Sequence, residues 1–260
     1  MKELVDTQNE HDDRHLAIDR VGVKNLRYPI TVRDKANSVQ QTVATVALAV
    51  DLPHQYKGTH MSRFIEVLNA HGPTLDVRSM AAIPTELLKR LSAREAHVHF
   101  EFPFFLEKKA PVTGAKGLMD YQVHFEVNAT AEDVDFVVTV EVPVTTLCPC
   151  SKAISAHGAH NQRGIVTYSV RFGDPIWIED LVALVEKCAS AELYSLLKRP
   201  DEKFVTEAAY DHPVFVEDLV RNVAARSRDQ ENIRWFKVEA ENFESIHNHN
   251  AYAVIESPSA

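Results

Sequence analysis

Strict alternation of apolar residues in one stretch constrains the fold more than any other feature of this chain. Six apolar side chains occupy every second position, namely Val134, Phe136, Val138, Val140, Val142 and Val144. Successive side chains of a strand point to opposite faces of its sheet, so this pattern predicts a strand over residues 134–145. Pro143 and Pro149 cannot donate to a sheet ladder. We therefore expect the strand to end in an irregular loop at Cys148 and Cys150.

The other periodic stretches predict one order of elements that occurs twice. The first half has strand, strand, helix, helix, strand and strand patterns at residues 21–33, 39–52, 59–71, 84–91, 96–105 and 118–129. The second half repeats this order at residues 134–145, 163–172, 177–188, 216–223, 232–241 and 251–256. The repeat predicts an α+β fold of two tandem ββααββ units, with antiparallel sheets and helices on one face. We expect a flexible arm at residues 1–19, followed by units at residues 20–131 and 132–260.

Composition and charge limit the classes of function. The chain has 260 residues and a formal net charge of -9, so attraction to nucleic acid or to an anionic membrane is not expected. No apolar run resembles a signal peptide or is long enough to span a membrane. The three cysteines imply no disulfide framework, and Cys188 falls on an apolar helical face that suits a core thiol. We expect a cytoplasmic protein whose reduced thiols can bind a metal.

The richest cluster of reactive side chains follows the alternating strand. Cys148 and Cys150 form a Cys-x-Cys pair, in which one or both thiolates could bind a metal. His157 and His160 come next, and their imidazoles could coordinate a metal or carry protons. The alternative is that these are incidental thiols and exposed loop histidines. The polar surroundings favour a functional role for Cys148 and for at least one histidine.

A second histidine cluster lies between the last two predicted strands. Residues 244–250 contain His247 and His249 in a His-x-His arrangement. On a strand this spacing would place both imidazoles on one face, where one could bind a metal and the other could orient it. The alternative is a polar hairpin turn, which Asn248 and Asn250 would suit.

Two acidic residues also have a functional and an ordinary interpretation. Glu202 lies in the charged stretch 199–207, where a carboxylate could complete a thiolate–imidazole site. From the residues alone, a solvated charged turn is the better interpretation of this stretch. Glu217 lies in the first turn of a predicted helix, where acids match the helix dipole. Because its neighbours are apolar, Glu217 could instead be a buried carboxylate that pairs with a ring N–H donor.

A basic segment joins a predicted strand to a predicted helix at residues 56–64. Lys57, His60 and Arg63 could bind phosphates at the start of this helix. The ordinary interpretation makes Thr59 an N-cap and Arg63 a surface charge.

Two motifs in this chain resemble one known family. The segments are Lys57-Gly-Thr-His-Met-Ser-Arg-Phe64 and Cys148-Pro-Cys-Ser-Lys152, the latter followed by His160-Asn-Gln-Arg163-Gly. They resemble type IB GTP cyclohydrolase over nearly the whole chain after the N-terminal arm. The resemblance implies a tunnelling fold with two ββααββ units and a homotetramer with active sites at subunit interfaces. It also implies that GTP and water are converted to formate and 7,8-dihydroneopterin triphosphate, the first step of folate biosynthesis.

The resemblance also implies roles for single residues. Cys148, Glu202 and His247 resemble the ligands of one divalent metal ion, which would be Zn²⁺, Mn²⁺ or Fe²⁺. His160 resembles the catalytic histidine, or a further ligand in one metal state. Glu217 resembles the carboxylate that holds the guanine ring. For the triphosphate, charge and position suggest five residues: Lys57, His60, Arg63, Lys152 and Arg163.

Two other functions compete with this interpretation. The first is an NADPH-dependent nitrile reductase, in which a cysteine forms a covalent thioimide and no metal is needed; Glu202 and the His247–His249 cluster argue against it. The second is a purine-binding or scaffold protein with a structural metal, which GTP turnover would exclude. The sequence leaves open whether Cys150, His157 or His249 also binds the metal.

Overall fold

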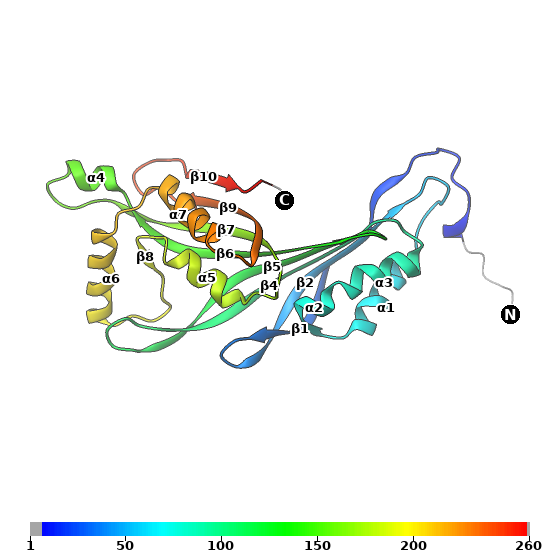
Figure 1. Cartoon of the computed structure of the whole chain (residues 1–260), viewed down its shortest axis with the longest axis horizontal. Coiled ribbons are helices and arrows are strands. Elements are labelled where there is room, and N and C mark those ends of the chain that lie inside the picture. Colours follow the sequence, from blue (N-terminus) through cyan, green and yellow to red (C-terminus); the bar gives the residue numbers. More distant parts are fainter. Residues whose placement is uncertain (1–6, 259–260) are drawn as a thin grey trace. The chain divides into compact units, whose positions relative to one another are not determined.

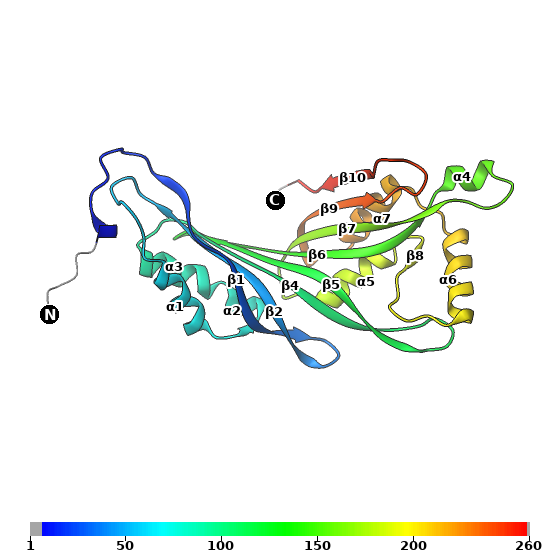
Figure 2. The same cartoon turned by 180° about the vertical axis from the view of Figure 1, so that it is seen from behind.

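The computed structural model describes residues 7–258. The elements of the first part of the chain are η1 (Thr7–Asn9), β1 (Ile18–Asp34), β2 (Ser38–Leu52), α1 (Met61–His71), β3 (Thr74–Leu75), α2 (Val77–Met80), α3 (Ala82–Leu91), β4 (Ala96–Lys109) and β5 (Lys116–Ala129). They are followed by β6 (Val134–Leu147), α4 (Pro149–Ile154), β7 (Asn161–Phe172), α5 (Ile178–Glu186), β8 (Ala191–Glu192), α6 (Arg199–Asp211), α7 (Val216–Arg228), β9 (Ile233–Asn242) and β10 (Ala251–Glu256). Figures 1 and 2 show these elements from opposite sides.

Hydrogen bonds join the strands into a single mixed sheet. Its ten strands follow the order β10-β9-β7-β6-β5-β4-β2-β1-β3, with β8 paired to β6. The pair β1–β3 is parallel, whereas β1–β2, β2–β4, β6–β7 and β7–β9 are antiparallel. The predicted fold class, an α+β tunnelling fold of two tandem ββααββ units with antiparallel sheets, is therefore wrong.

The connection between β5 and β6 explains this difference. Only residues 130–133 separate the two strands, and the backbone N–H of Thr130 donates to the carbonyl of Asp133 at 2.9 Å. Such a tight hairpin extends a ladder and does not begin a second sheet. The short elements β3, α2, α4, β8 and α6 also interrupt the predicted six-element order.

Every strand that the periodicity predicted overlaps an observed one, but two predicted loops are wrong. β6 ends at Leu147, directly before the cysteines as predicted, and Pro143 lies inside the strand opposite Ile165 of β7. The cysteine segment forms the short helix α4, whose first residue is Pro149. Proline is well suited to the first position of a helix, because the N–H group that it lacks would have no acceptor within the helix. The charged stretch expected to be a solvated turn is the first part of α6.

The chain forms two compact units, which are described separately. The first unit comprises residues up to Phe102 together with His124–Val137. In it α1 and α3 pack on each other and on β1 and β2. The apolar faces of these helices supply Phe64, Leu68 and Leu87 to the core, all fully buried. Full burial of each such side chain contributes roughly 1.5–3 kcal/mol.

The N-terminal arm contacts the first unit where the structure describes it. The backbone N–H of Gly58 donates to Gln8 O at 3.0 Å, and that of Lys57 donates to Glu10 O at 3.1 Å. Residues 1–6 of the predicted arm lie outside the described residues. The flexibility of the arm and the unit boundaries at residues 20 and 132 stay predictions.

The second unit comprises Pro103–Val123 and the residues from Val138 onward. Helices α5 and α7 pack on its strands and on each other. Four fully buried apolar residues of these helices are Leu181, Val185, Leu219 and Val223. In the described part of the chain, no helix has the length and apolar character needed to cross a membrane.

Candidate functional site

The first site residue, Cys148, lies where β6 meets α4. β6 ends at Leu147, and Cys148 is the N-cap of α4, with its Sγ accepting from the backbone N–H of Ser151 at 3.4 Å. The hydroxyl of Ser151 donates back to the Cys148 carbonyl at 3.1 Å. The half-buried thiol is therefore fixed in direction by the first turn of the helix, whereas Cys150 on the same turn is exposed.

His160 lies beside Cys148 because β7 returns next to β6. The backbone N–H of Cys148 donates to His160 O at 3.1 Å, just beyond the ladder pair Leu147–Asn161. The backbone N–H of His160 donates to Ser151 Oγ at 3.2 Å. The structure thus brings together the two residues predicted to be catalytic. His157 is exposed in the loop between them.

The imidazole of His160 is held on one side by polar side chains. Its Nδ1 lies 3.1 Å from Gln162 Oε1 and 3.3 Å from Ser245 Oγ. The amide Nε2 of Gln162 donates to Thr146 Oγ1 at 2.9 Å, and both Gln162 and Thr146 are buried. Because this amide orients Oε1 toward the ring, Nδ1 carries the proton and Nε2 is left to accept one.

The two predicted carboxylates lie at the starts of neighbouring helices. Glu202 is in the first turn of α6 and Glu217 is in the first turn of α7, and both side chains are exposed. The exposed position of Glu217 does not fit the functional interpretation from the residues, a buried carboxylate among apolar neighbours, and it matches the ordinary one, an acid in the first turn of a helix. Its role as a ligand for a purine ring stays a prediction.

The two histidines of the second cluster lie in the turn between β9 and β10. His247 and His249 are exposed, and their rings stack with centroids 5.1 Å apart. The segment is not a strand, as one interpretation required. It is the polar turn that the alternative described, although a turn can still present an imidazole to a ligand.

The predicted metal site was tested against the donor atoms and their positions. A thiolate, a carboxylate and an imidazole are a chemically suitable set for Zn²⁺, Mn²⁺ or Fe²⁺. Among residues 7–258, however, no group of three or more His, Cys, Asp or Glu side chains is arranged to hold a metal ion. The single chain therefore does not assemble Cys148, Glu202 and His247 into a site, and we derive no chemical step through a metal.

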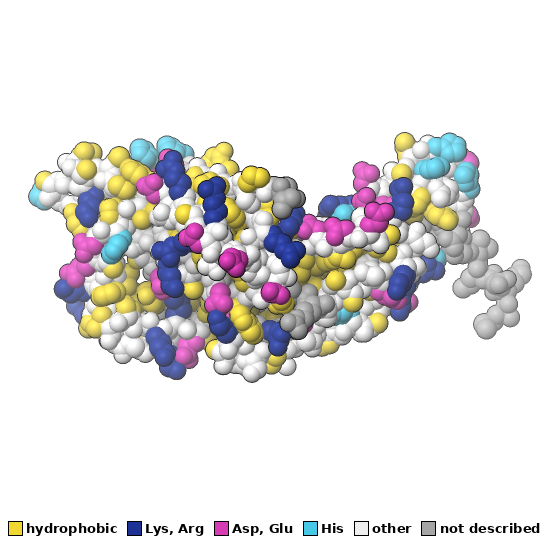
Figure 3. Space-filling view, in the orientation of Figure 1, with side chains coloured by type: hydrophobic (Ala, Val, Ile, Leu, Met, Phe, Trp, Pro, Cys, Tyr) yellow, Lys and Arg dark blue, Asp and Glu magenta, His cyan; other side chains and the backbone are white. Residues whose placement is uncertain are grey.

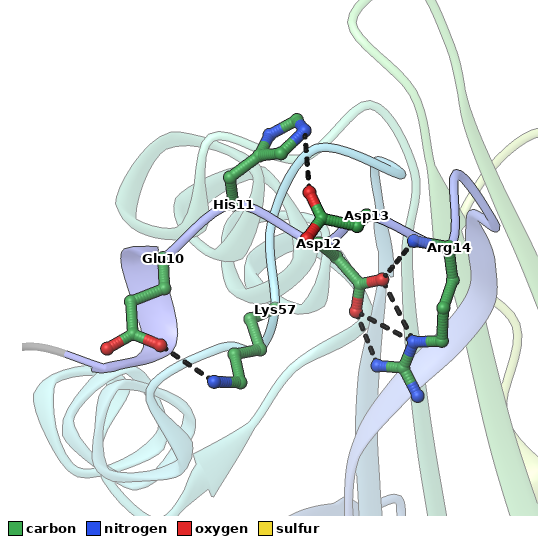
Figure 4. Close-up of polar contacts among 6 residues, drawn as sticks. All are labelled: Glu10, His11, Asp12, Asp13, Arg14 and Lys57. Carbon is green, nitrogen blue, oxygen red and sulfur yellow. Dashed lines mark hydrogen bonds and ion pairs between the residues drawn. The ribbon is translucent and has the colours of Figure 1, made fainter.

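Three of the five residues suggested for the triphosphate can be placed by their contacts. In the first unit, Lys57 forms an ion pair with Glu10 at 2.7 Å (Figure 4), and Arg63 donates to the carbonyl of Arg90 at 3.0 Å. In the second unit, Lys152 donates to the carbonyl of Tyr210 and lies 4.2 Å from the centre of its ring. Arg163 is exposed on β7. His60, the fifth, is the N-cap residue of α1, the position that had been expected for Thr59.

Charges on the second unit do not gather into one basic field on the face that Figure 3 shows. Basic and acidic side chains are interspersed there. An anionic substrate would therefore be held by individual cations and not by a broad positive surface.

Sequence reasoning missed a buried carboxylate next to Glu202. Asp201 is fully buried and accepts four hydrogen bonds, from Val112, Thr113 and Lys198. Burial by itself would raise the pKa of Asp201, but these hydrogen bonds outweigh it and hold that pKa well below its usual range. Pro200 directly before an acidic residue was an available signal for the start of α6, because proline followed by an acid is typical of a first helical turn, but it gives no indication that Asp201 is buried.

Comparison with known proteins identifies the family. Residues 4–253 match the family model described as type I GTP cyclohydrolase FolE2. The chain belongs to this family. It is 67% identical over 259 residues to the GTP cyclohydrolase FolE2 of Akkermansia muciniphila, covering 98% of each chain. It is 55% identical over 253 residues to the GTP cyclohydrolase FolE2 of Magnetococcus marinus, covering 97% of this chain and 96% of that one.

The solved structures that resemble the fold are of urate oxidases. The uricase of Arthrobacter globiformis matches with a TM-score of 0.53 and 10% identity, covering 92% of each chain. A mutant urate oxidase labelled BTUO matches with a TM-score of 0.56 and 8% identity, covering 92% of this chain and 99% of that one. At such identities the likeness concerns the fold alone, and it supports the correction from two tandem units to one continuous sheet.

Proposed function

We propose that this FolE2-family chain hydrolyses GTP at C8, releases formate and forms 7,8-dihydroneopterin triphosphate, the first step of folate biosynthesis. The relatives named GTP cyclohydrolase FolE2 match it over nearly its full length. The observation that carries the proposal is the junction of β6, α4 and β7, where the backbone N–H of Cys148 donates to the carbonyl of His160 and Ser151 contacts both residues.

The proposed reaction needs proton transfers that His160 can supply. A first water adds to C8, and the imidazole ring opens to a formamide. A second water hydrolyses the formamide to formate and an amine, and ring closure after rearrangement of the ribose returns one water. With Nδ1 held by Gln162 and Ser245, the Nε2 atom of His160 is the one that takes a proton from water and passes it to a leaving nitrogen.

Recognition of guanine is assigned to Glu217. A carboxylate has two oxygens and can accept hydrogen bonds from guanine N1–H and from the 2-amino group together. Adenine presents no such pair of donors, so ATP would leave the carboxylate without partners and bind poorly. The exposed place of Glu217 in the first turn of α7 leaves its oxygens accessible to a substrate.

Four further features belong to the proposal. One divalent metal ion, Zn²⁺, Mn²⁺ or Fe²⁺, would be held by Cys148, Glu202 and His247, and its role would be to activate water. The assembly would be a homotetramer with interfacial active sites, which would allow ligands from more than one chain to meet. The type IB subdivision and a cytoplasmic location complete the proposal.

The proposal is tested by incubating the purified protein with GTP and each divalent metal ion in turn. Formate release and the fluorescence of the oxidised pterin product are followed, and ATP serves as the control nucleotide. We expect turnover of GTP alone, abolished by a chelator and restored by Mn²⁺. Absence of formate with every metal would refute the activity, and full activity after metal removal would refute the metal requirement.

A further inference from the structure

Asp201 in the first turn of α6 accepts three hydrogen bonds from a distant loop and one from Lys198 at the start of its own helix. Its Oδ1 accepts from the backbone N–H groups of Val112 at 2.9 Å and Thr113 at 2.8 Å. Its Oδ2 accepts from the Thr113 hydroxyl at 2.7 Å and from the backbone N–H of Lys198 at 2.9 Å. A carboxylate offers about four lone-pair positions, so the hydrogen-bonding capacity of Asp201 is filled.

The loop that Asp201 binds is a tight turn between β4 and β5. Gly114 has a positive φ of 70°, which suits glycine, and its N–H donates to Ala110 O at 3.0 Å. The N–H of Ala110 donates to Ala115 O at 2.8 Å across the turn. This geometry leaves the N–H groups of residues 112 and 113 free to point at one acceptor. Asp201 therefore joins α6 to a rigid loop 89 residues away in the sequence.

Glu202, the next residue, depends on this junction for its place. Its backbone is held within α6, because its N–H donates to Lys198 O at 2.9 Å and its carbonyl accepts from Thr206 Oγ1 at 2.7 Å. In the part of the chain that the structure describes, the exposed carboxylate of Glu202 itself makes no hydrogen bond or ion pair. The direction of this side chain is thus set by the first turn of α6, and that turn is anchored by Asp201.

We propose that Asp201 and Thr113 are positioning residues for the reaction, because together they fix the first turn of α6 and so the place of Glu202. The inference rests on the proposed function, in which Glu202 takes part. Displacement of a reacting group by about 1 Å can cost about a hundredfold in rate, so a clamp of this kind has a measurable effect.

The test compares variants that remove the clamp with variants that keep it. Asp201→Asn replaces one acceptor oxygen by a donor that would face other donors, and Thr113→Val removes only the hydroxyl. Thr113→Ser keeps the hydroxyl and serves as the conservative rescue. Glu207→Gln removes an exposed carboxylate from the same helix, where it pairs only with Lys203, and serves as the matched control.

Steady-state kinetics with GTP are measured together with amide hydrogen exchange of residues 110–115 and 198–206. We expect Asp201→Asn to lower kcat about tenfold or more with KM changed less than about twofold, since Glu217 on α7 still binds guanine. Exchange should be faster in both segments. Thr113→Val should show a smaller loss of kcat, whereas Thr113→Ser and Glu207→Gln should match the wild type.

Glu202→Gln separates failure of this inference from failure of the proposed function. A wild type that releases no formate refutes the proposed function and this inference with it. If the wild type is active and Glu202→Gln is inactive, unchanged kcat in folded Asp201→Asn and Thr113→Val overturns this inference alone. Should Asp201→Asn fail to fold, Thr113→Val decides: lower thermal stability with unchanged kcat would mean that the clamp is only structural.

Discussion

The two halves of the candidate site are built in different ways. Cys148 and His160 are tied to each other and to their surroundings by short hydrogen bonds through Ser151 and Gln162. Glu202, Glu217 and His247 are exposed residues on two helix starts and a turn. The first half is preformed within one chain, whereas the second half presents its functional groups outward.

This difference indicates which part of the proposed reaction each half of the site serves. A preformed pair of side chains suits a proton-transfer step, which needs fixed geometry. Outward-facing carboxylates and imidazoles suit groups that bind something from outside the chain, whether a purine, a metal ion or another subunit. Substitutions in the first half should therefore act on kcat, whereas substitution of Glu217 in the second half should act on GTP binding.

The largest effect is expected at the centre of the preformed half. Cys148→Ala removes the thiol that the first turn of α4 directs, and turnover of GTP should fall by roughly a thousandfold or more, with the fold retained. Formate release measures the loss. Cys150→Ala, on the same turn but exposed, is the comparison and should keep most activity. Normal turnover by Cys148→Ala would refute the assignment of Cys148 as the essential thiol of the site.

On the outward-facing half, Glu217→Ala should raise KM for GTP by at least about a hundredfold while changing kcat much less. The reason is the loss of two hydrogen bonds to a charged acceptor, each contributing about 1.5–3 kcal/mol. Initial rates over a range of GTP concentrations separate the two constants. Asp218→Asn is the neighbouring control, since Asp218 pairs with Arg221 at 3.2 Å on the helix surface. A kcat effect without a KM effect would place Glu217 in the chemical step.

The network behind His160 offers a smaller effect. Gln162→Leu leaves Nδ1 of His160 without the acceptor that orients it, and kcat should fall about tenfold with little change in KM. Thr146→Val acts one step further away and should have a weaker effect in the same direction. Thr139→Val is the control, because it breaks a similar hydroxyl contact with Ser169 at 2.8 Å elsewhere in the β6–β7 ladder. Equal losses in all three variants would mean that the ladder and not the histidine is being disturbed.

The two halves also differed in how far the sequence could predict them. Cys148 and His160 flank strands that alternate clearly, and strands so close in sequence usually pair. Their proximity therefore follows from local patterns. Glu202 and His247 were candidates from their residue types alone, but only the resemblance to a known family joined them to Cys148 in one site, because no periodicity connects them to it. That resemblance is confirmed at the level of the FolE2 family, while the roles of these single residues stay predictions.

Prediction of the fold from the sequence reached the same limit. Periodicity located every long strand, because alternation depends only on which face is buried. It could not say that β5 and β6 pair across a tight hairpin, since the pairing partner of a strand is not encoded in its own alternation. Helix α6 was missed because its apolar stripe is weak, and one of its two buried residues is the charged Asp201. The burial of this carboxylate cannot be recognised from the local sequence, because it depends on hydrogen bonds from the distant residues Val112 and Thr113.

The smallest predicted effect concerns the third thiol, which contrasts with the two at the site. Cys188 is 3% exposed, and burial raises the pKa of its thiol to about 11, from an ordinary value of 9.0. The folded state thus keeps its proton after the unfolded state has lost it, so stability should be constant below pH 9 and fall as the pH rises from about 9 to 11. The loss should approach about 2 kcal/mol at the upper end. Urea unfolding at pH 8 and 9.5 measures the slope in the wild type and in Cys188→Ala. Tyrosines of the unfolded state, with an ordinary pKa of 10.0, begin to ionise in this range and contribute equally to both proteins, so the variant should have the shallower slope. An unchanged slope in that variant would mean that another group titrates. In a separate alkylation experiment, iodoacetamide should modify Cys148 and Cys150 long before Cys188.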